Sequence, residues 1–170
     1  AKQGFPSAQY NLGLMYKKGL GVPQDYKTAV RWLKVAADKG FSNARHALGE
    51  LYEDGQGIPQ NYKTAVKWYR LAAEQGFPDS QNNLGRMYLS GKGIQQNYKE
   101  AVKWYLLAAK QGYAAAQFNM GGVFQFGQGV PQDDKIAVKW FRLSAEQGYA
   151  PAQSNLGVMY SNGLGVPQDE

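Results

Sequence analysis

The sequence predicts an all-α solenoid made of helix-turn-helix repeats of 36 residues. The four tryptophans, Trp32, Trp68, Trp104 and Trp140, follow one another at intervals of 36 residues. Two series of glycines have the same spacing: Gly4, Gly40, Gly76, Gly112 and Gly148, and Gly13, Gly49, Gly85, Gly121 and Gly157. A fixed period of this size indicates stacked units, none of which buries its apolar face alone. We therefore expect about nine helices in one array over residues 1–170, with units at roughly 4–39, 40–75, 76–111, 112–147 and, in part, 148–170.

The first helix of each unit is predicted between two glycine signals. Gly40 is expected to end the preceding helix in the left-handed conformation. The residue after each such glycine is aromatic, as expected for the apolar contact of this helix stop: Phe5, Phe41, Phe77, Tyr113 and Tyr149. A helix over about 42–54 then carries apolar residues at helical spacing. Gly49 inside it costs about 1 kcal/mol relative to alanine, so its recurrence indicates a neighbouring helix at close range.

The second helix of each unit is predicted to start after a glycine-proline turn. In the second unit this turn is Gly55–Pro59. Asn61 is the expected N-cap, and the same slot holds Asp25, Asn97 and Asp133. The helix is expected to bury Tyr62, Ala65, Val66, Trp68, Tyr69, Ala72 and Ala73, with tryptophan and tyrosine filling the space between repeats.

The net charge of +6 raises the question of nucleic-acid binding. Eleven of the 19 Lys and Arg residues fall on one face of the second helices, opposite the tryptophans. They are Lys27, Arg31, Lys34, Lys63, Lys67, Arg70, Lys99, Lys103, Lys135, Lys139 and Arg142. Exposed aromatics are not interleaved with them, as a nucleic-acid groove would require. We interpret them as a solvated ridge and expect no nucleic-acid partner.

Motifs for catalysis, metals and cofactors are missing from the sequence. His46 is the only histidine, no serine can be placed beside it from the sequence, and cysteine is absent. No phosphate-binding loop, zinc motif or calcium loop occurs. No window resembles a membrane helix. We expect no enzyme activity, no cofactor, no metal site and no membrane span.

These residues resemble the Sel-one-like repeat family, a relative of the tetratricopeptide repeat. The matching pattern is Ala-x-x-x-Leu-Gly-x-x-Tyr, then Gly-x-Gly-Val-Pro-Gln-Asp, then Ala-Val-x-Trp-Tyr-x-x-Ala-Ala-Glu-Gln-Gly. The resemblance covers essentially the whole chain and implies a right-handed superhelix of antiparallel helix pairs. It also implies a scaffold whose first helices line a concave protein-binding surface, in bacterial or eukaryotic proteins of periplasmic, secreted or cytoplasmic location. Two departures, Gln95 for the loop proline and Asp134 for the tyrosine at 26, 62 and 98, affect only local geometry.

Comparison of the repeats with one another suggests where a ligand would bind. On the first helices, positions such as Ala8, Leu12, Gly13 and Tyr16 recur and therefore serve the fold. The positions that vary share another face, which we call the variable face. Its members are Tyr10, Leu14, Lys17 and Lys18; His46, Glu50, Glu53 and Asp54; Asn82, Arg86, Leu89 and Ser90; Phe118, Gly122, Gln125 and Phe126; and Ser154, Val158, Ser161 and Asn162. Its character changes from basic through acidic and mixed to aromatic.

The leading hypothesis is a protein-interaction scaffold that binds a partner protein or peptide on the variable face. Basic residues of the partner would lie over the second unit, and an apolar anchor over Phe118 and Phe126. The alternatives are unconstrained surface positions, or an exported module that binds glycan, cell wall or host protein through exposed Tyr10, Phe118 and Phe126. Since both chain ends interrupt a repeat, end-to-end self-association is also expected.

Overall fold

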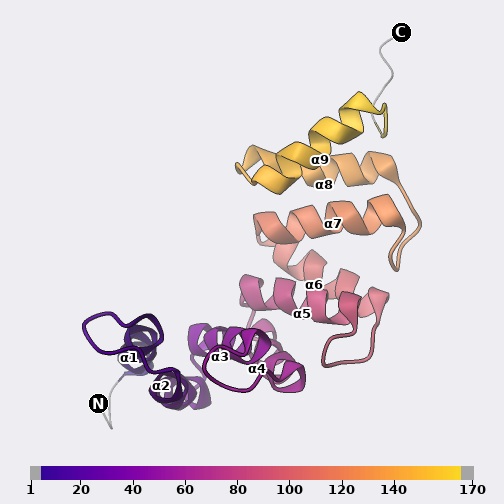
Figure 1. Cartoon of the computed structure of the whole chain (residues 1–170). Helices are drawn as coiled ribbons and strands as arrows, with labels where there is room; N and C mark the ends of the chain where they lie inside the picture. The colour runs from indigo at the N-terminus through magenta and orange to yellow at the C-terminus, as the bar shows by residue number, and fades with distance from the viewer. Residues whose placement is uncertain (1–4, 166–170) are drawn as a thin grey trace. The chain divides into compact units, whose positions relative to one another are not determined.

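The computed structural model describes residues 5–165, and within that range it contains nine α-helices and no strand. The first helices of the repeats are α1 (Pro6–Lys18), α3 (Ser42–Asp54), α5 (Pro78–Ser90), α7 (Ala114–Phe126) and α9 (Ala150–Ser161). The second helices are α2 (Tyr26–Asp38), α4 (Tyr62–Ala73), α6 (Tyr98–Lys110) and α8 (Asp134–Glu146) (Figure 1). The predicted all-α solenoid of 36-residue repeats is confirmed.

The helices divide between two compact units, which we describe separately. The first unit holds α1 to α4, the start of α5 up to Ser80, and the loop at 91–95. In it, α1 packs on α2, and α3 packs on both α2 and α4. The second unit holds the rest of α5 and α6 to α9. In it, α7 packs on α6 and α8, and α8 packs on α9 (Figure 1).

Within residues 5–165 the predicted glycine stops and N-caps are present, and the first predicted stop, Gly4, lies outside that range. At the end of α2, Gly40 has φ +89°. The Phe41 N–H donates to the Ala36 carbonyl at 3.1 Å, and the Gly40 N–H donates to that of Ala37 at 2.9 Å, which together form a Schellman stop. At the start of α4, the Asn61 side chain accepts from the Thr64 N–H at 2.9 Å. Asp25, Asn97 and Asp133 cap their helices in the same way, so Asp134 beside the last cap does not disturb α8.

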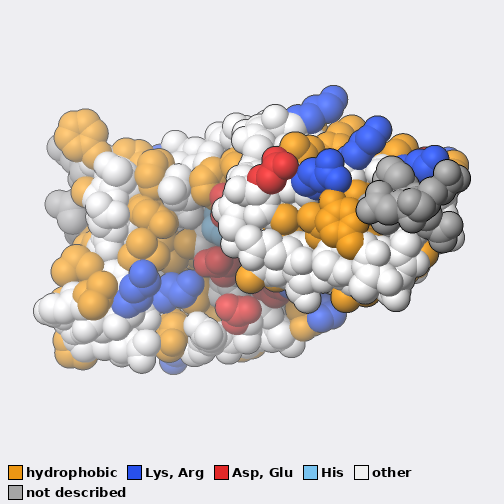
Figure 2. Space-filling model, turned by 90° about the horizontal axis from the view of Figure 1, so that it is seen from above, with side chains coloured by type: hydrophobic (Ala, Val, Ile, Leu, Met, Phe, Trp, Pro, Cys, Tyr) orange, Lys and Arg blue, Asp and Glu red, His pale blue; other side chains and the backbone are white. Residues whose placement is uncertain are grey.

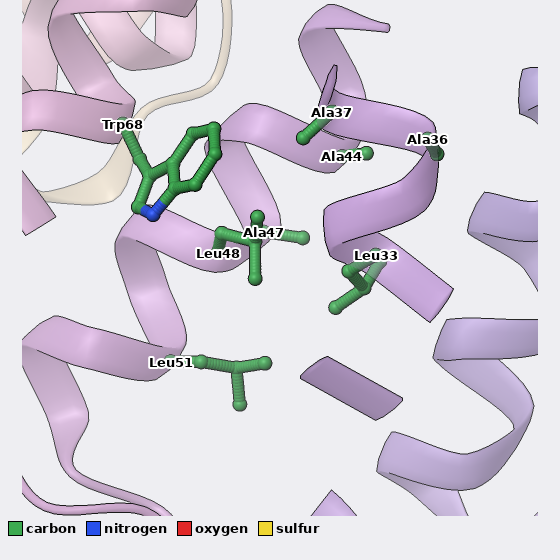
Figure 3. Close-up of a cluster of buried hydrophobic side chains, with 8 residues drawn as sticks. All are labelled: Leu33, Ala36, Ala37, Ala44, Ala47, Leu48, Leu51 and Trp68. Atoms are coloured by element: carbon green, nitrogen blue, oxygen red, sulfur yellow. The ribbon is translucent and has the colours of Figure 1, made fainter. Parts of the chain in front are cut away.

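Within each unit the core lies between successive helices rather than in a central mass. In the first unit its buried part combines side chains from three successive helices (Figure 3): Leu33, Ala36 and Ala37; Ala44, Ala47, Leu48 and Leu51; and Trp68. Alanines allow the helix backbones to approach, and the Trp68 ring fills the space beside α3. Trp68 is 8% exposed. Its predicted role between repeats is therefore confirmed, although Tyr62, also predicted as buried, is only partly so.

The glycines inside the first helices are explained by close helix contacts. A Cβ atom on Gly49 would lie 2.4 Å from the Tyr69 ring, and one on Gly85 would lie 2.7 Å from the Tyr105 ring. A Cβ atom added to Gly13 would likewise lie too close to Leu33, and one added to Gly121 too close to Phe141. Gly157 is the exception, since nothing lies within 4 Å of its added Cβ. Each contacting side chain lies 20 residues after its glycine, and that position for Gly157 would fall beyond residue 170.

The basic residues of the second helices are mostly exposed to solvent, as predicted. Ten of the eleven are exposed, and Arg70 is partly buried. The interrupted repeats at the chain ends, on which the expected end-to-end association depends, involve residues 1–4 and 166–170, which lie outside the described range.

Candidate functional site

The variable face of the first unit is a connected polar network rather than a set of independent side chains. Glu50 on α3 lies at its centre. One Glu50 carboxylate oxygen is 3.4 Å from Lys17 Nζ of α1, and the other is 3.3 Å from His46 Nε2, one helical turn earlier. The hydrogen bond from His46, with the positive charges of His46 and Lys17, lowers the pKa of Glu50 although burial opposes this shift. The basic α1 and the acidic α3 therefore partly neutralise each other.

The other predicted residues of this unit are also positioned by neighbours. The Tyr10 ring packs edge-on against Phe41, with centroids 5.3 Å apart. Burial raises the pKa of Tyr10, and the charge of Glu50 adds to the effect. Glu53 accepts a hydrogen bond of 2.7 Å from the Tyr69 hydroxyl. Lys18 and Asp54, at the ends of α1 and α3, are exposed, whereas Leu14 is partly buried.

The structure corrects one expectation about His46, because a serine does lie beside it. His46 Nδ1 is 2.9 Å from Ser80 Oγ, so Ser80, His46 and Glu50 form a hydrogen-bonded chain. Ser80 is 0% exposed. A nucleophile must reach its substrate, so a buried hydroxyl of this kind does not serve as one. These hydrogen bonds orient the His46 imidazole, which also packs on the rings of Tyr69 and Phe77.

In the second unit, the α5 members of the variable face have different surroundings. Asn82 is buried and accepts a hydrogen bond of 2.7 Å from the Asn119 side chain of α7. Leu89 packs against the core between α6 and α7. Arg86 is exposed. Burial raises the pKa of Tyr105, and the charge of Arg86 partly opposes this shift. Of these three predicted contact residues, only Arg86 is accessible to a large ligand.

The α7 members include the most exposed aromatic residue of the variable face. Phe126, the last residue of α7, is 68% exposed. One turn earlier, an added Cβ at Gly122 would have no atom within 4 Å. Phe118 differs from expectation, because it is half-buried and packs on Phe141 and Tyr149 with centroids 5.5 and 5.6 Å away. Tyr10 is likewise only partly exposed, so the expectation of three exposed aromatics is wrong for two of them.

Sequence reasoning missed Ser80, Asn119 and Tyr69 as partners of variable residues. Tyr69 and Ser80 come from positions assigned to the fold, and their polar atoms point toward the variable face of a neighbouring helix. A spacing rule could have found Ser80 and Asn119. They follow His46 and Asn82 by 34 and 37 residues, close to one repeat.

The described residues were also compared with what a metal site or a membrane-spanning helix requires. Over residues 5–165, no group of three or more histidine or acidic side chains gathers as a metal site would require. In that same range, no helix combines the length and apolar character needed to cross a membrane. Exposed hydrophobic side chains lie among charged ones on the face seen in Figure 2.

Comparison with known proteins gives the same architecture. The Sel1 repeat model matches residues 6–41, 42–77, 78–113, 114–149 and 150–170. A protective antigen of uropathogenic Escherichia coli has a solved structure that is 42% identical, with a TM-score of 0.93. The match covers 97% of this chain but 35% of that one. This chain therefore spans about a third of the length of that relative.

Two further solved structures extend the comparison. A Sel1 repeat protein from Oxalobacter formigenes is 41% identical with a TM-score of 0.89, over 96% of this chain and 68% of that one. Cysteine-rich protein B of Helicobacter pylori, 24% identical with a TM-score of 0.56, matches 65% of this chain and 86% of its own, and shares the fold. No curated protein matches the chain. With five consecutive repeats matched from residue 6 to residue 170, the chain belongs to the Sel1 repeat family.

Proposed function

We propose that this chain is a non-catalytic scaffold that binds a segment of a partner protein on the variable face of its first helices. Proteins of the Sel1 repeat family are generally protein-interaction scaffolds, and they are typically non-catalytic. The buried position of Ser80 in the one serine-histidine-glutamate chain agrees with this proposal.

The observation that carries the proposal is the exposure of Phe126. A large ring that is 68% exposed leaves apolar area in water, and covering it on binding is favourable. Gly122 leaves open space one turn away, where a partner side chain could lie against the ring. Val158, at the position on α9 that corresponds to Gly122, is 52% exposed and adds further apolar area to the variable face of this unit. Hot spots of interfaces are commonly such aromatic anchors.

The first unit would contribute polar recognition. Glu50 is engaged by Lys17 and His46, and Glu53 by Tyr69, so these groups are held in defined positions before binding. Preorganised polar groups add specificity because less side-chain entropy is lost on binding. Lys18 and Asp54 remain exposed for partner charges. This refines the idea of a purely basic partner segment over the second repeat, because part of the negative charge there is already paired.

The alternative, a glycan or cell-wall binding module, has weaker support. Sugar rings would stack on exposed aromatics, and two of the three candidates, Tyr10 and Phe118, are held in ring clusters and only partly exposed. Competition with oligosaccharides separates the two functions, since a glycan-binding module would release its ligand and a protein scaffold would not.

The proposal is tested by capturing partners on the immobilised chain and then measuring affinity for the purified partner by calorimetry. The variant is Phe126→Ser, and the matched control is Leu143→Ser. Leu143 lies on α8, a second helix, and is 45% exposed. We expect Phe126→Ser to weaken binding about 30-fold, as for a hot spot of about 2 kcal/mol, and Leu143→Ser to change it less than twofold. Equal affinity of both variants and the unmodified chain would remove the α7 surface from the proposal.

A further inference from the structure

The cleft beside α4 in the first unit carries an unusual concentration of positive charge. It is open, with a volume of about 400 Å³. Lys63, Lys67 and Arg70 line it, at positions i, i+4 and i+7 of one helix face. No acidic residue is among the side chains that line it. None of these residues belongs to the variable face.

The two lysines are not neutralised by the protein itself. Among the described residues, neither Lys63 nor Lys67 forms an ion pair. Lys67 Nζ instead lies 5.8 Å from the ring centroid of Trp68. α4 itself contains no acidic residue, and its C-cap Glu74 lies one turn beyond Arg70. The ammonium groups of the cleft are therefore open to an external anion.

The rest of the cleft is apolar and comes partly from a neighbouring loop. Val66 and Leu71 of α4 face Ile94 of the loop at 91–95. The same loop supplies a further cation, since Lys92 Nζ lies 5.4 Å from the ring centroid of Tyr62, the residue before Lys63. The equivalent loop positions in the other repeats hold Leu20, Gln56, Gln128 and Leu164. A ligand of this cleft would thus combine an anionic group with an apolar body.

α6 and α8 differ from α4 in this combination, whereas α2 carries three cations at the same positions, Lys27, Arg31 and Lys34. In α6, Leu106 replaces the arginine, and Lys103 is paired with Glu100 at 3.6 Å. In α8, Arg142 donates a hydrogen bond of 2.7 Å to the Tyr160 hydroxyl. Arg142 is also the single cation among the residues that line the cleft between α8 and α9, whereas three cations line the cleft beside α4. What distinguishes the second repeat is the added loop cation Lys92, since the equivalent loop positions of the other repeats hold no cation.

We propose that the α4 cleft binds a small organic phosphate, with its phosphate held by Lys63, Lys67 and Arg70 and its apolar part against Val66, Leu71 and Ile94. A phosphate monoester carries close to two negative charges at pH 7, which suits three adjacent cations better than a single carboxylate does. Arg supplies a bidentate donor, and each Lys supplies a mobile point charge. Ligand pockets of about 300 to 1,000 Å³ with apolar walls and a few polar groups are typical of small-molecule sites.

The test is an NMR titration of the full chain with phenyl phosphate, inorganic phosphate and phenol. We expect phenyl phosphate to bind more tightly than inorganic phosphate, because only the former covers the apolar wall, and phenol to bind undetectably. The shifts should centre on the Trp68 indole and the amides of Gly93 and Ile94. No binding of phenyl phosphate, or shifts spread over the basic faces of all four second helices, would overturn the proposal.

Two double variants with the same change in net charge distinguish a specific site in the α4 cleft from nonspecific attraction of the anion to a basic protein. Lys63→Glu with Lys67→Glu should weaken phenyl phosphate binding about tenfold or more, since two charge contacts are reversed. Lys99→Glu with Lys103→Glu, the same positions on α6, should change it less than twofold. An equal loss in both variants would show that net charge alone attracts the anion and would refute the site. Should the first variant fold poorly, Lys67→Gln alone replaces it, with Lys103→Gln as control.

Discussion

Adding one methyl group at Gly49 and at Gly157 is expected to change the free energy of unfolding in opposite directions. Both residues lie inside first helices, where alanine is favoured over glycine by about 1 kcal/mol. They occupy equivalent repeat positions and differ in what surrounds them. The added Cβ meets the Tyr69 ring at Gly49 and finds no atom within 4 Å at Gly157.

The magnitude follows from the contact at Gly49. A Cβ atom 2.4 Å from Tyr69 Cε1 forces a shift of about 1 Å, because ordinary contacts begin near 3.4 Å. The ring is 1% exposed, and its hydroxyl is held by Glu53, so neither end moves cheaply. Overpacking of this kind costs about 1–3 kcal/mol. We take an overpacking cost of about 2–3 kcal/mol, which the helix-propensity gain of about 1 kcal/mol partly offsets. Gly49→Ala should therefore lower the free energy of unfolding by about 1–2 kcal/mol. Gly157→Ala should raise the free energy of unfolding by up to about 1 kcal/mol.

Urea unfolding followed by circular dichroism measures both variants in the same chain. Since repeat proteins can unfold in parts, the midpoint of each variant is compared with that of the unmodified chain rather than with a single global value. We expect a lower midpoint for Gly49→Ala and an equal or higher one for Gly157→Ala. Stabilisation by Gly49→Ala would refute the inference that close packing against Tyr69 is why the first helices carry glycine.

Three further expectations concern single contacts. Asn61→Ala should lose about 1 kcal/mol, because the Thr64 N–H loses its capping acceptor; a urea midpoint unchanged from that of the unmodified chain, or an equal loss in the isosteric Asn61→Asp, would contradict this. Trp68→Ala should lose about 3–5 kcal/mol, since the ring is 8% exposed and borders the core of α2 and α3; a loss below about 1 kcal/mol in urea unfolding would contradict its place between repeats. The folded-state pKa of Glu50 is lowered from its ordinary value of 4.5, so its contribution is present above that pH and is lost as pH falls through the lower, folded value. Relative to Glu50→Gln, the unmodified chain should therefore lose stability between pH 5 and 3, by less than about 1 kcal/mol because the side chain is 41% exposed; parallel pH profiles in thermal unfolding would rule this out.

The candidate site was only partly predictable from sequence. Comparing repeats separates fold positions from variable ones, and by that criterion Phe118 and Phe126 look alike. Their environments differ because Phe118 meets Phe141 and Tyr149 from neighbouring elements, whereas Phe126 ends its helix. A helical pattern gives the direction in which a side chain leaves its own helix, whereas the burial of that side chain depends on the neighbouring helix.

The charged residues show the same limit. Lys17 and Glu50 were predicted as separate basic and acidic surfaces on successive repeats, yet their charged groups lie 3.4 Å apart. The sequence gives the number and spacing of charges, whereas their pairing depends on how α1 and α3 pack, and Coulomb energies at such distances depend on separation and burial. The Ser80–His46 contact escaped prediction for the same reason.

By itself, the sequence determined the all-α class, the 36-residue period, the helix bounds to within about a residue, the four N-caps and the left-handed glycine stops. These features depend on interactions within a few residues of the chain, which local sequence specifies. The tertiary structure alone decided which side chain packs against each glycine, which variable residues are exposed, and which lysines form no ion pair. Those outcomes arise between helices tens of residues apart, where the packing of whole surfaces sets distance, burial and charge pairing.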